Sequence, residues 1–292
     1  MSSNEEIQET NTEARFEFKK EEASAFKSEK GLDEETIRVI SEDKDEPDWM
    51  LQRRLRALEQ FQEMPMPTNW PEAPDLSEID VDEIVPYIRP DIETRGGVDD
   101  WTDLPEEIQD TFDKLGIPEA EKNALSGVGA QYESEIVYQN MQEQWEEKGV
   151  VFCDMDEAVQ EHEDLVKEYF MTQAVPPSDN KCAALHGAIW SGGSFVYVPE
   201  DTKVEMPIQA YFRMNSAGMG QFEHTLIIAQ DSSEVHYLEG CSAPIYSEFN
   251  LHCGGVEVFV KATAHVQYST VQNWSKTTYN LHTHPPLAPQ PG

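Results

Sequence analysis

Apolar and polar residues alternate along the chain from about Gly192 onward, and the residues there are often β-branched or aromatic. This alternation is typical of β-strands. The run 196–198 (Val-Tyr-Val) recurs 31 positions later as 227–229 (Ile-Ile-Ala) and after another 31 as 258–260 (Val-Phe-Val). A fixed period of this size, built from short strands, favours a β-helix over helical repeats. An ordinary antiparallel sandwich with accidental spacing is the alternative.

A second register repeats with the same period. The segment 204–206 maps onto 235–237 and then onto 266–268, and small turn residues precede each copy. The repeat predicts that Val204, Val235 and Val266 lie in one stack. We therefore expect residues 181–281 to form a parallel β-helix core. The matched turn residues are Thr202, Ser233 and Ala264.

Residues 33–180 are expected to be mainly helical. Asp45 and Glu46 before Pro47 suit a first helical turn, and a second helix is predicted over 104–116. The run 134–148, with apolar residues near helical spacing, predicts a third helix. A short strand is expected at 149–153, followed by a helix that Asp154 caps.

The two ends of the chain differ from the rest in composition. Residues 1–32 are polar and dense in charge, which predicts a disordered acidic arm. Residues 282–292 are rich in proline and are expected to be a divergent tail. The first 30 residues lack the apolar stretch of a signal peptide, and no apolar run is long enough to span a bilayer. We therefore expect a cytoplasmic protein that does not insert into a membrane.

The chain is strongly acidic, with 57 Asp and Glu residues against 21 Lys and Arg, a net charge of −36. Such a surface repels phosphate backbones, so nucleic acid is not an expected partner. Self-repulsion at this charge is relieved when salt screens it. The composition favours adaptation to a salty cytoplasm, as in a haloarchaeal halophile, and a merely acidic protein is the alternative.

Two cysteines are the candidate chemical residues. Cys241 lies in the segment 239–244, which looks like a turn after a strand where a thiol is exposed. Cys253 follows twelve positions later, next to His252. Thiolates suit iron and other soft metals, but this spacing is not a four-ligand signature, and buried inert cysteine is the alternative. His282 and His284 have chelating spacing, yet their place in the tail argues against a site there.

Motifs of common enzyme classes are absent from the sequence. It contains no GxxxxGK[ST] loop, so the chain is not expected to hydrolyse ATP, and no GxGxxG, GxSxG or HExxH motif. Some β-helices carry carbohydrate-cleaving sites, which need clustered acid and base groups. Glu205, His236 and Gln267 share one repeat position, but their mixed chemistry makes a poor acid–base set.

Several short segments, in order along residues 35–281, form a specific combination. The segments are 46–51 (Glu-Pro-Asp-Trp-Met-Leu), 115–122 (Leu-Gly-Ile-Pro-Glu-Ala-Glu-Lys), 131–135 (Gln-Tyr-Glu-Ser-Glu), 191–199 (Ser-Gly-Gly-Ser-Phe-Val-Tyr-Val-Pro), 211–215 (Tyr-Phe-Arg-Met-Asn), 239–244 (Glu-Gly-Cys-Ser-Ala-Pro) and 268–274 (Tyr-Ser-Thr-Val-Gln-Asn-Trp). Together they resemble the SufB family of iron–sulfur cluster assembly proteins.

The resemblance implies an α+β fold, with a helical N-terminal region followed by a right-handed parallel β-helix. It implies a non-enzymatic scaffold that assembles a transient iron–sulfur cluster, expected to be 4Fe-4S, and leaves open whether a flavin takes part. Cys241 matches the family cysteine that receives sulfur. Cys241 and Cys253 are the expected metal ligands.

The resemblance also implies partners. These are a SufC-type ATPase, SufD or a second SufB copy, a cysteine desulfurase pathway and acceptor apoproteins. Family members continue with further β-turns and a C-terminal helical segment, so a C-terminally truncated product with an incomplete β-helix is expected. A non-catalytic SufD-like subunit and a non-functional fragment are the alternatives.

Overall fold

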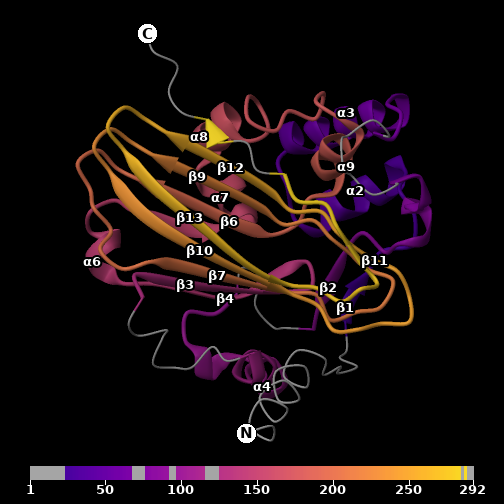
Figure 1. The fold of residues 1–292 in the computed structure, drawn as a ribbon, viewed down its shortest axis with the longest axis horizontal. Coiled ribbons are helices and arrows are strands. Elements are labelled where there is room, and N and C mark those ends of the chain that lie inside the picture. The colour runs from indigo at the N-terminus through magenta and orange to yellow at the C-terminus, as the bar shows by residue number, and fades with distance from the viewer. Residues whose placement is uncertain (1–23, 68–75, 92–96, 116–124, 284–285, 288–292) are drawn as a thin grey trace, which may run out of the picture.

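The computed structural model describes residues 24–67, 76–91, 97–115, 125–283 and 286–287. Its fold is mixed α+β, with helices packed around several mostly parallel sheets (Figure 1). The helices are α2 (Glu34–Asp43), α3 (Asp48–Glu63), α4 (Glu106–Leu115), α6 (Glu143–Glu146), α7 (Met155–Glu161), α8 (Glu163–Tyr169) and α9 (Lys181–Ile189), with 3₁₀ turns at Leu76–Glu78, Val81–Glu83 and Trp101–Asp103.

Successive strands of the second half of the chain belong to three different sheets in a repeating order. One sheet has the order β13-β10-β7-β3-β4, a second β14-β11-β8 and a third β15-β12-β9-β6-β5. Strands three apart in the chain therefore lie side by side, and they pair in parallel. The strands are β1 (Ser24–Lys27), β2 (Ile88–Pro90), β3 (Gly127–Tyr132), β4 (Glu135–Met141), β5 (Val151–Asp154), β6 (Gly193–Val198), β7 (Ile208–Arg213), β8 (Gly220–Gln221), β9 (His224–Ala229), β10 (Glu234–Ser242), β11 (Asn250–His252), β12 (Gly255–Val260), β13 (His265–Asn273), β14 (Thr278–Asn280) and β15 (Pro286–Leu287).

The register of this pairing confirms the 31-residue repeat. Val196 pairs with Ile227, and Ile227 pairs with Val258. The turn before each copy of the next strand also repeats, with a left-handed residue at φ near 60° in each. None of these residues is glycine, so each turn carries a small conformational cost that the ladder on both sides offsets. The left-handed residues are Asp201 (58°), Ser232 (61°) and Thr263 (60°).

The predicted valine stack is present. Lys203 bridges to Glu234, which places Val204 beside Val235, and Val235 pairs with Val266. Val204 and Val235 are buried and Val266 packs against the same apolar cluster between the sheets. The 31-residue segments that carry the repeat, here called coils, each contribute residues to this cluster.

The first half matches the sequence prediction in several elements, but β2, β3 and β4 are strands in a region that was expected to be mainly helical. Helices α3 and α4, strand β5 and the Asp154 cap on α7 are as expected, with Asp154 accepting from the Glu157 N–H at 2.7 Å. The helix predicted over 134–148 is wrong. Residues 135–141 are strand β4, which pairs antiparallel with β3 around a turn at Glu133 (φ 56°), and only the short α6 follows.

The chain ends also need correction where they are described. Residues 24–27 of the predicted disordered arm form β1, which pairs with β2, whereas residues 1–23 lie outside the described residues. Residues 286–287 of the predicted tail form β15 beside β12, whereas 284–285 and 288–292 lie outside them. The segment 116–124, which includes most of one family-like motif, is also outside them. Within the described part of the chain, no helix combines the length and apolarity needed to cross a membrane.

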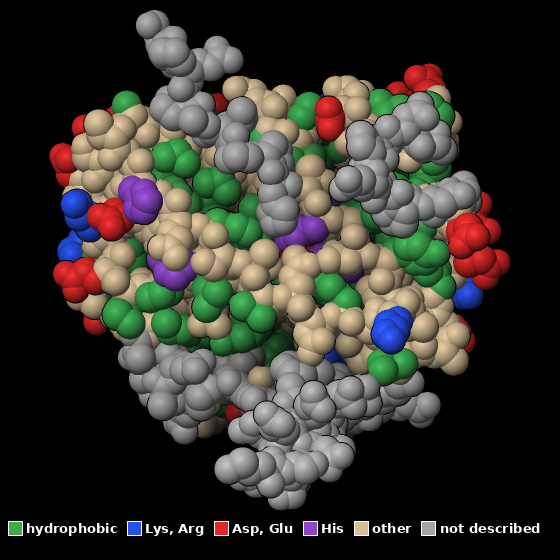
Figure 2. All heavy atoms as spheres, in the orientation of Figure 1, with side chains coloured by type: hydrophobic (Ala, Val, Ile, Leu, Met, Phe, Trp, Pro, Cys, Tyr) green, Lys and Arg blue, Asp and Glu red, His purple; other side chains and the backbone are tan. Residues whose placement is uncertain are grey.

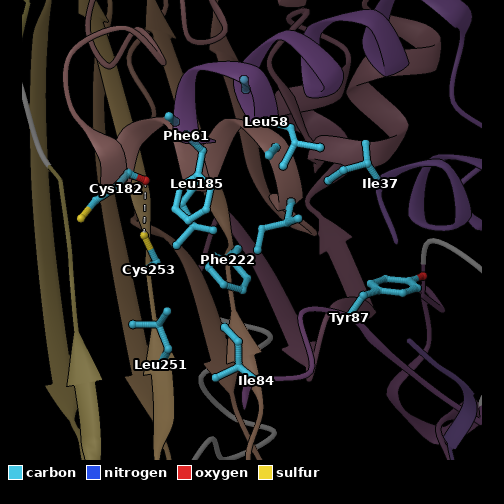
Figure 3. Packing of buried hydrophobic residues seen from close by; sticks show 14 of the residues in the cluster. Ile37, Leu58, Phe61, Ile84, Tyr87, Cys182, Leu185, Phe222, Leu251 and Cys253 are labelled. Carbon is cyan, nitrogen blue, oxygen red and sulfur yellow. Dashed lines mark hydrogen bonds between the residues drawn. The ribbon is translucent and has the colours of Figure 1, made fainter. Parts of the chain in front are cut away.

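A second core joins the helices to the coils. Leu58 and Phe61 of α3 and Leu185 of α9 pack onto Phe222 and Leu251 beneath them (Figure 3). Figure 1 shows α2, α3 and α9 gathered at the end of the sheets where β11 lies, and α4 beside β3 and β4. Acidic side chains lie mainly around the rim of the face shown in Figure 2, not over its strands.

Candidate functional site

Strand β10 places Cys241 inside the molecule. Its side chains alternate, so Val235, Tyr237, Glu239 and Cys241 share the inward face, and Cys241 is 2% exposed. The expectation of an exposed thiol in a turn is therefore wrong. The strand continues through Ser242 because β13 pairs with it as far as Asn273.

Glu239 is the hydrogen-bond partner of the Cys241 thiol. The Cys241 Sγ–H donates to Glu239 Oε1 at 3.6 Å. The same carboxylate accepts from the Tyr268 hydroxyl at 3.0 Å and from Thr225 Oγ1 at 3.1 Å. Hydroxyls from the neighbouring coil and from β9 therefore fix the orientation of the carboxylate beside the sulfur.

Glu223 and His252 form the second side of the cluster. Glu223 precedes β9, and His252 ends β11, so two further coil segments contribute one residue each. The Glu223 carboxylate contacts His252 Nε2, and both side chains are buried. Glu223 Oε2 is also buried and has no hydrogen-bond partner among the described residues.

His282 closes the cluster from the last described coil. Its Nε2 lies 3.8 Å from Glu239 Oε1, and its side chain is 7% exposed. Gly254 permits this approach, because a Cβ there would lie 2.5 Å from His282 Cδ2 and 2.7 Å from Glu223 Oε1. The structure thus brings in a histidine that the sequence pattern argued against.

The cluster offers two overlapping sets of donor atoms that suit a metal ion. One set is Glu223, Cys241 and His252, and the other is Glu223, Glu239 and His282; in each, the donor atoms lie within 4.8 Å of one another. Imidazole nitrogen, carboxylate oxygen and thiolate sulfur suit iron and zinc.

Cys253 lies apart from this cluster. Its Sγ points toward the Cys182 carbonyl oxygen, 4.0 Å away, in the core beneath α9 (Figure 3). It belongs to neither donor set formed by the described residues. The structure therefore brings Cys241 together with potential ligands and does not bring Cys253 to them.

Burial shapes the protonation of the cluster. Burial, together with the Glu223 charge, raises the pKa of Glu239 to about 7. Burial and the nearby Glu239 and Glu223 carboxylates raise the pKa of Cys241 well above its ordinary value. Burial opposes a charge on His252, but Glu223 and a hydrogen bond to Asn280 outweigh it and raise the pKa of the imidazole. A bound cation would reverse this balance, because it favours the thiolate.

A cavity of about 210 Å³ lies on the outer face of β10, at the Cys241 end of the strand. Phe112 and Leu115 of α4 line it from one side and Tyr211, Gly240 and Val271 from the sheet. Gly240 has the Tyr211 ring over it, since a Cβ there would lie 3.1 Å from Tyr211 Cδ1. Glu239 and Cys241 also line this cavity, so it borders the cluster.

The sequence pattern indicated Cys241 but missed Glu223, Glu239 and His282 as a group. Their spacing in the chain is irregular, because they come from three successive coils. The 31-residue repeat could have indicated that Glu223 and His252 lie close together. His252 and Gly254 follow Gln221 and Glu223 by 31 positions, and β8 pairs with β11 in that register.

Two family models match the chain. The model described as "SufBD protein N-terminal region" matches residues 104–210, and the one described as "SUF system FeS cluster assembly, SufBD core domain" matches residues 212–286. The two matches meet within β7, so together they run from just before α4 to the start of β15.

Similar proteins carry the description iron–sulfur cluster assembly SufBD family protein. One from Staphylococcus saprophyticus is 54% identical over 264 residues, which is 90% of this chain and 55% of that protein. One from Staphylococcus haemolyticus is 53% identical and one from Staphylococcus aureus MRSA252 is 52% identical, each over 91% of this chain and 56% of the relative. The chain spans about half the length of these relatives. They are staphylococcal and not haloarchaeal, so they give no support to the predicted halophilic source.

Proposed function

This chain belongs to the SufBD family of iron–sulfur cluster assembly proteins, and from that premise we propose that it is a scaffold subunit which receives sulfur on Cys241. The supporting observation is the position of Cys241, whose sulfur lies among Glu223, Glu239 and His252. A thiol placed only as core filling does not need two buried carboxylates and an imidazole around it.

The sulfur step is a thiol–persulfide exchange. The Cys241 thiolate attacks the outer sulfur of a donor persulfide, and a new S–S bond forms as the donor's S–S bond breaks. The electron pair leaves with the donor thiolate, which takes up the proton released from Cys241. The products are a Cys241 persulfide and a donor thiol. Cys241 is oxidised as the donor is reduced, so the exchange needs no external oxidant or reductant.

The cargo of this scaffold is an iron–sulfur cluster, proposed to be 4Fe-4S, that is passed on to apoproteins. The sequence contains no phosphate-binding loop, so ATP hydrolysis is assigned to a SufC-type partner and the scaffold itself is non-enzymatic. SufD or a second SufB-type copy completes the complex, a cysteine desulfurase supplies the sulfur, and assembly takes place in the cytoplasm.

The platform is proposed to be a right-handed parallel β-helix. Three observations support it: the cyclic order of strands among three sheets, their parallel pairing and the 31-residue register. In such a platform successive coils place side chains in rows, and a donor cluster can be assembled from residues far apart in sequence. Glu223, Cys241, His252 and His282 follow this arrangement.

Mass spectrometry of trapped persulfides tests the proposal. The chain is incubated anaerobically with a cysteine desulfurase and cysteine, alkylated and digested. The peptide that contains Cys241 is expected to gain one sulfur atom, which a reducing agent removes. The peptide that contains Cys153, another buried cysteine, is the internal control and should stay unchanged. Sulfur on Cys153 or on no cysteine contradicts the proposal.

A non-catalytic SufD-like subunit is the second candidate. The burial of Cys241, only 2% exposed, favours it, because a persulfide donor cannot reach that sulfur without movement of the chain around it. The two candidates differ in one outcome. A Cys241→Ser protein that assembles clusters in the complex as well as the parent supports the SufD-like subunit.

A further inference from the structure

We propose that Glu223, Cys241 and His252 bind one divalent first-row metal ion, and that His282 is not a ligand of this ion but carries a protonated Nε2 that faces Glu239. The inference rests on the proposed function in one respect only, which is that iron is the ion bound in the cell. The site itself follows from the hydrogen bonds around the two histidines.

The first donor set has the composition and closeness that a metal needs. Its three donor atoms lie within 4.8 Å of one another, and all three residues are buried. Ligand atoms around a tetrahedral ion lie about 3.4 Å apart at a metal–nitrogen distance of about 2.1 Å. Small side-chain rotations therefore close the set around an ion, without movement of the strands.

A chain of hydrogen bonds fixes the tautomer of His252. The indole N–H of Trp274 can only donate, and it donates to Gln272 Oε1 at 3.1 Å. Asn280 Nδ2 donates to the same oxygen at 2.5 Å, which leaves Asn280 Oδ1 to accept from His252 Nδ1–H at 2.7 Å. His252 therefore carries a proton on Nδ1, and its Nε2 faces Glu223, where a metal ion takes the place of the second proton.

Trp274 also fixes the tautomer of His282, which is the opposite of the His252 tautomer. Because Gln272 Oε1 is held by Trp274, the Gln272 amide nitrogen faces His282 Nδ1 at 2.8 Å and donates to it. A neutral His282 must then carry its proton on Nε2, the atom 3.8 Å from Glu239 Oε1. A protonated nitrogen has no lone pair for a metal, so His282 is excluded as a ligand while Gln272 keeps this orientation.

A buried oxygen atom without a partner gives an independent reason for an ion. Glu223 is 1% exposed, and its Oε2 has no hydrogen-bond partner among the described residues. Leaving a buried carboxylate oxygen unpaired is costly, and such atoms often mark the place of an ion. A divalent ion bound to the Glu223 carboxylate and the Cys241 thiolate also leaves the donor set neutral.

The number of ligands suits a site that exchanges its ion. Three protein ligands leave at least one coordination position open, unlike the closed four-ligand sites of structural zinc. Glu239, held by Tyr268 and Thr225, lies beside the Cys241 sulfur and lines this open side. Sulfur that arrives at Cys241 would thus meet a metal ion already bound next to it.

Anaerobic titration of the full chain with Co²⁺ alone, without sulfide, tests the site. The parent is expected to bind one Co²⁺ with a thiolate-to-cobalt charge-transfer absorption. Cys241→Ser should lose that absorption, and His252→Gln should weaken binding at least 10-fold. His282→Gln should bind one Co²⁺ with the parent's spectrum and an affinity within about 3-fold. His236→Gln is the matched control, since His236 bonds to Ser269 outside the cluster.

The outcomes separate this inference from the proposed function. If the folded parent binds no Co²⁺, the metal site is overturned. If His282→Gln and His252→Gln lose binding equally, the role of His282 is overturned. Both conclusions hold whatever the persulfide experiment shows. Nitrogen-15 NMR of the Zn²⁺-loaded chain gives a second readout. It should show zinc-shifted Nε2 at His252 and a proton on Nε2 at His282. The reverse assignment contradicts the inference even if every variant folds poorly.

Discussion

Cys241 Sγ lies 3.6 Å from Glu239 Oε1 because the two residues are two positions apart on β10 and share its inward face. Burial and this carboxylate raise the pKa of the Cys241 thiol, because a charge inside the protein and a second negative charge beside Glu239 are both unfavourable. A metal ion bound to Glu223 and His252 reverses that effect. Under the proposed function, sulfur chemistry at Cys241 therefore requires prior metal binding.

The valine stack is expected to contribute to stability as a core. Val235→Ala removes two buried methyl groups between coils and should lower the free energy of unfolding by about 1–3 kcal/mol. Val271→Ala, at a side chain 65% exposed on β13, is the control and should change it by less than about 0.5 kcal/mol. Denaturant unfolding of both variants checks the prediction, and equal effects would argue against a shared core.

Arg54 is expected to be the most costly charged side chain of α3 to remove. It is fully buried, donates to Glu46 Oε2 at 2.8 Å and to the Trp190 carbonyl at 3.0 Å, and lies 4.6 Å from the Trp190 ring. Arg54→Ala leaves Glu46 buried and unpaired, which should cost about 3–5 kcal/mol. Arg56→Ala, two positions away and exposed, should cost less than about 0.5 kcal/mol in the same unfolding experiment.

Asp154 is expected to make stability depend on pH. Burial and the Asp156 charge raise the pKa of its carboxyl from an ordinary 3.8 to about 7. The folded state therefore binds a proton that the unfolded state releases, and stability decreases as the pH rises from about 4 to about 7, by at most about 4 kcal/mol. Asn at position 154 keeps an acceptor for the Glu157 N–H.

Urea unfolding at about pH 5 and about pH 8 measures this effect. The decrease in the free energy of unfolding between these pH values should be smaller in Asp154→Asn than in the parent. The comparison between the two proteins removes the contributions of other groups. An equal or larger decrease in the variant would show that Asp154 is ionised in the folded state throughout.

Gly254 is expected to be required for the donor cluster. A methyl group there would lie 2.5 Å from His282 Cδ2 and 2.7 Å from Glu223 Oε1, so one of these side chains must move. Gly254→Ala should weaken Co²⁺ binding at least 10-fold and lower the free energy of unfolding by about 1–3 kcal/mol. Unchanged affinity in a folded variant would show that the added methyl group displaces His282 and not Glu223, and that Gly254 is not required for the donor set.

The sequence predicted which strands of the coils lie side by side, because the apolar pattern repeats every 31 residues and such a repeat can be read from the sequence alone. It failed at β4, where Ile136, Val137 and Tyr138 are buried in succession and the period-two signal is lost. The turn before β4 uses Glu133 in a left-handed conformation, which a glycine would have indicated and a glutamate does not.

The candidate site was predicted only in part, for a related reason. Cys241 was identified as a candidate from the segment 239–244. Gly240 and Pro244 are typical of turns, so the sequence did not predict that β10 continues through Cys241. Burial of Cys241 depends on its pairing with Gln272, which lies 31 residues away. Contacts between coils also bring His282 to Glu239, and no local pattern in the sequence contains them.

Anaerobic reconstitution with ferrous iron and sulfide tests the central claim most directly, because it measures cluster assembly at the Cys241 site. The parent is expected to develop the broad visible absorption of a bound iron–sulfur cluster. Cys241→Ser should lose most of it, whereas Cys153→Ser, which removes a buried cysteine outside both donor sets, should retain it. Equal absorption in the parent and Cys241→Ser would contradict the account.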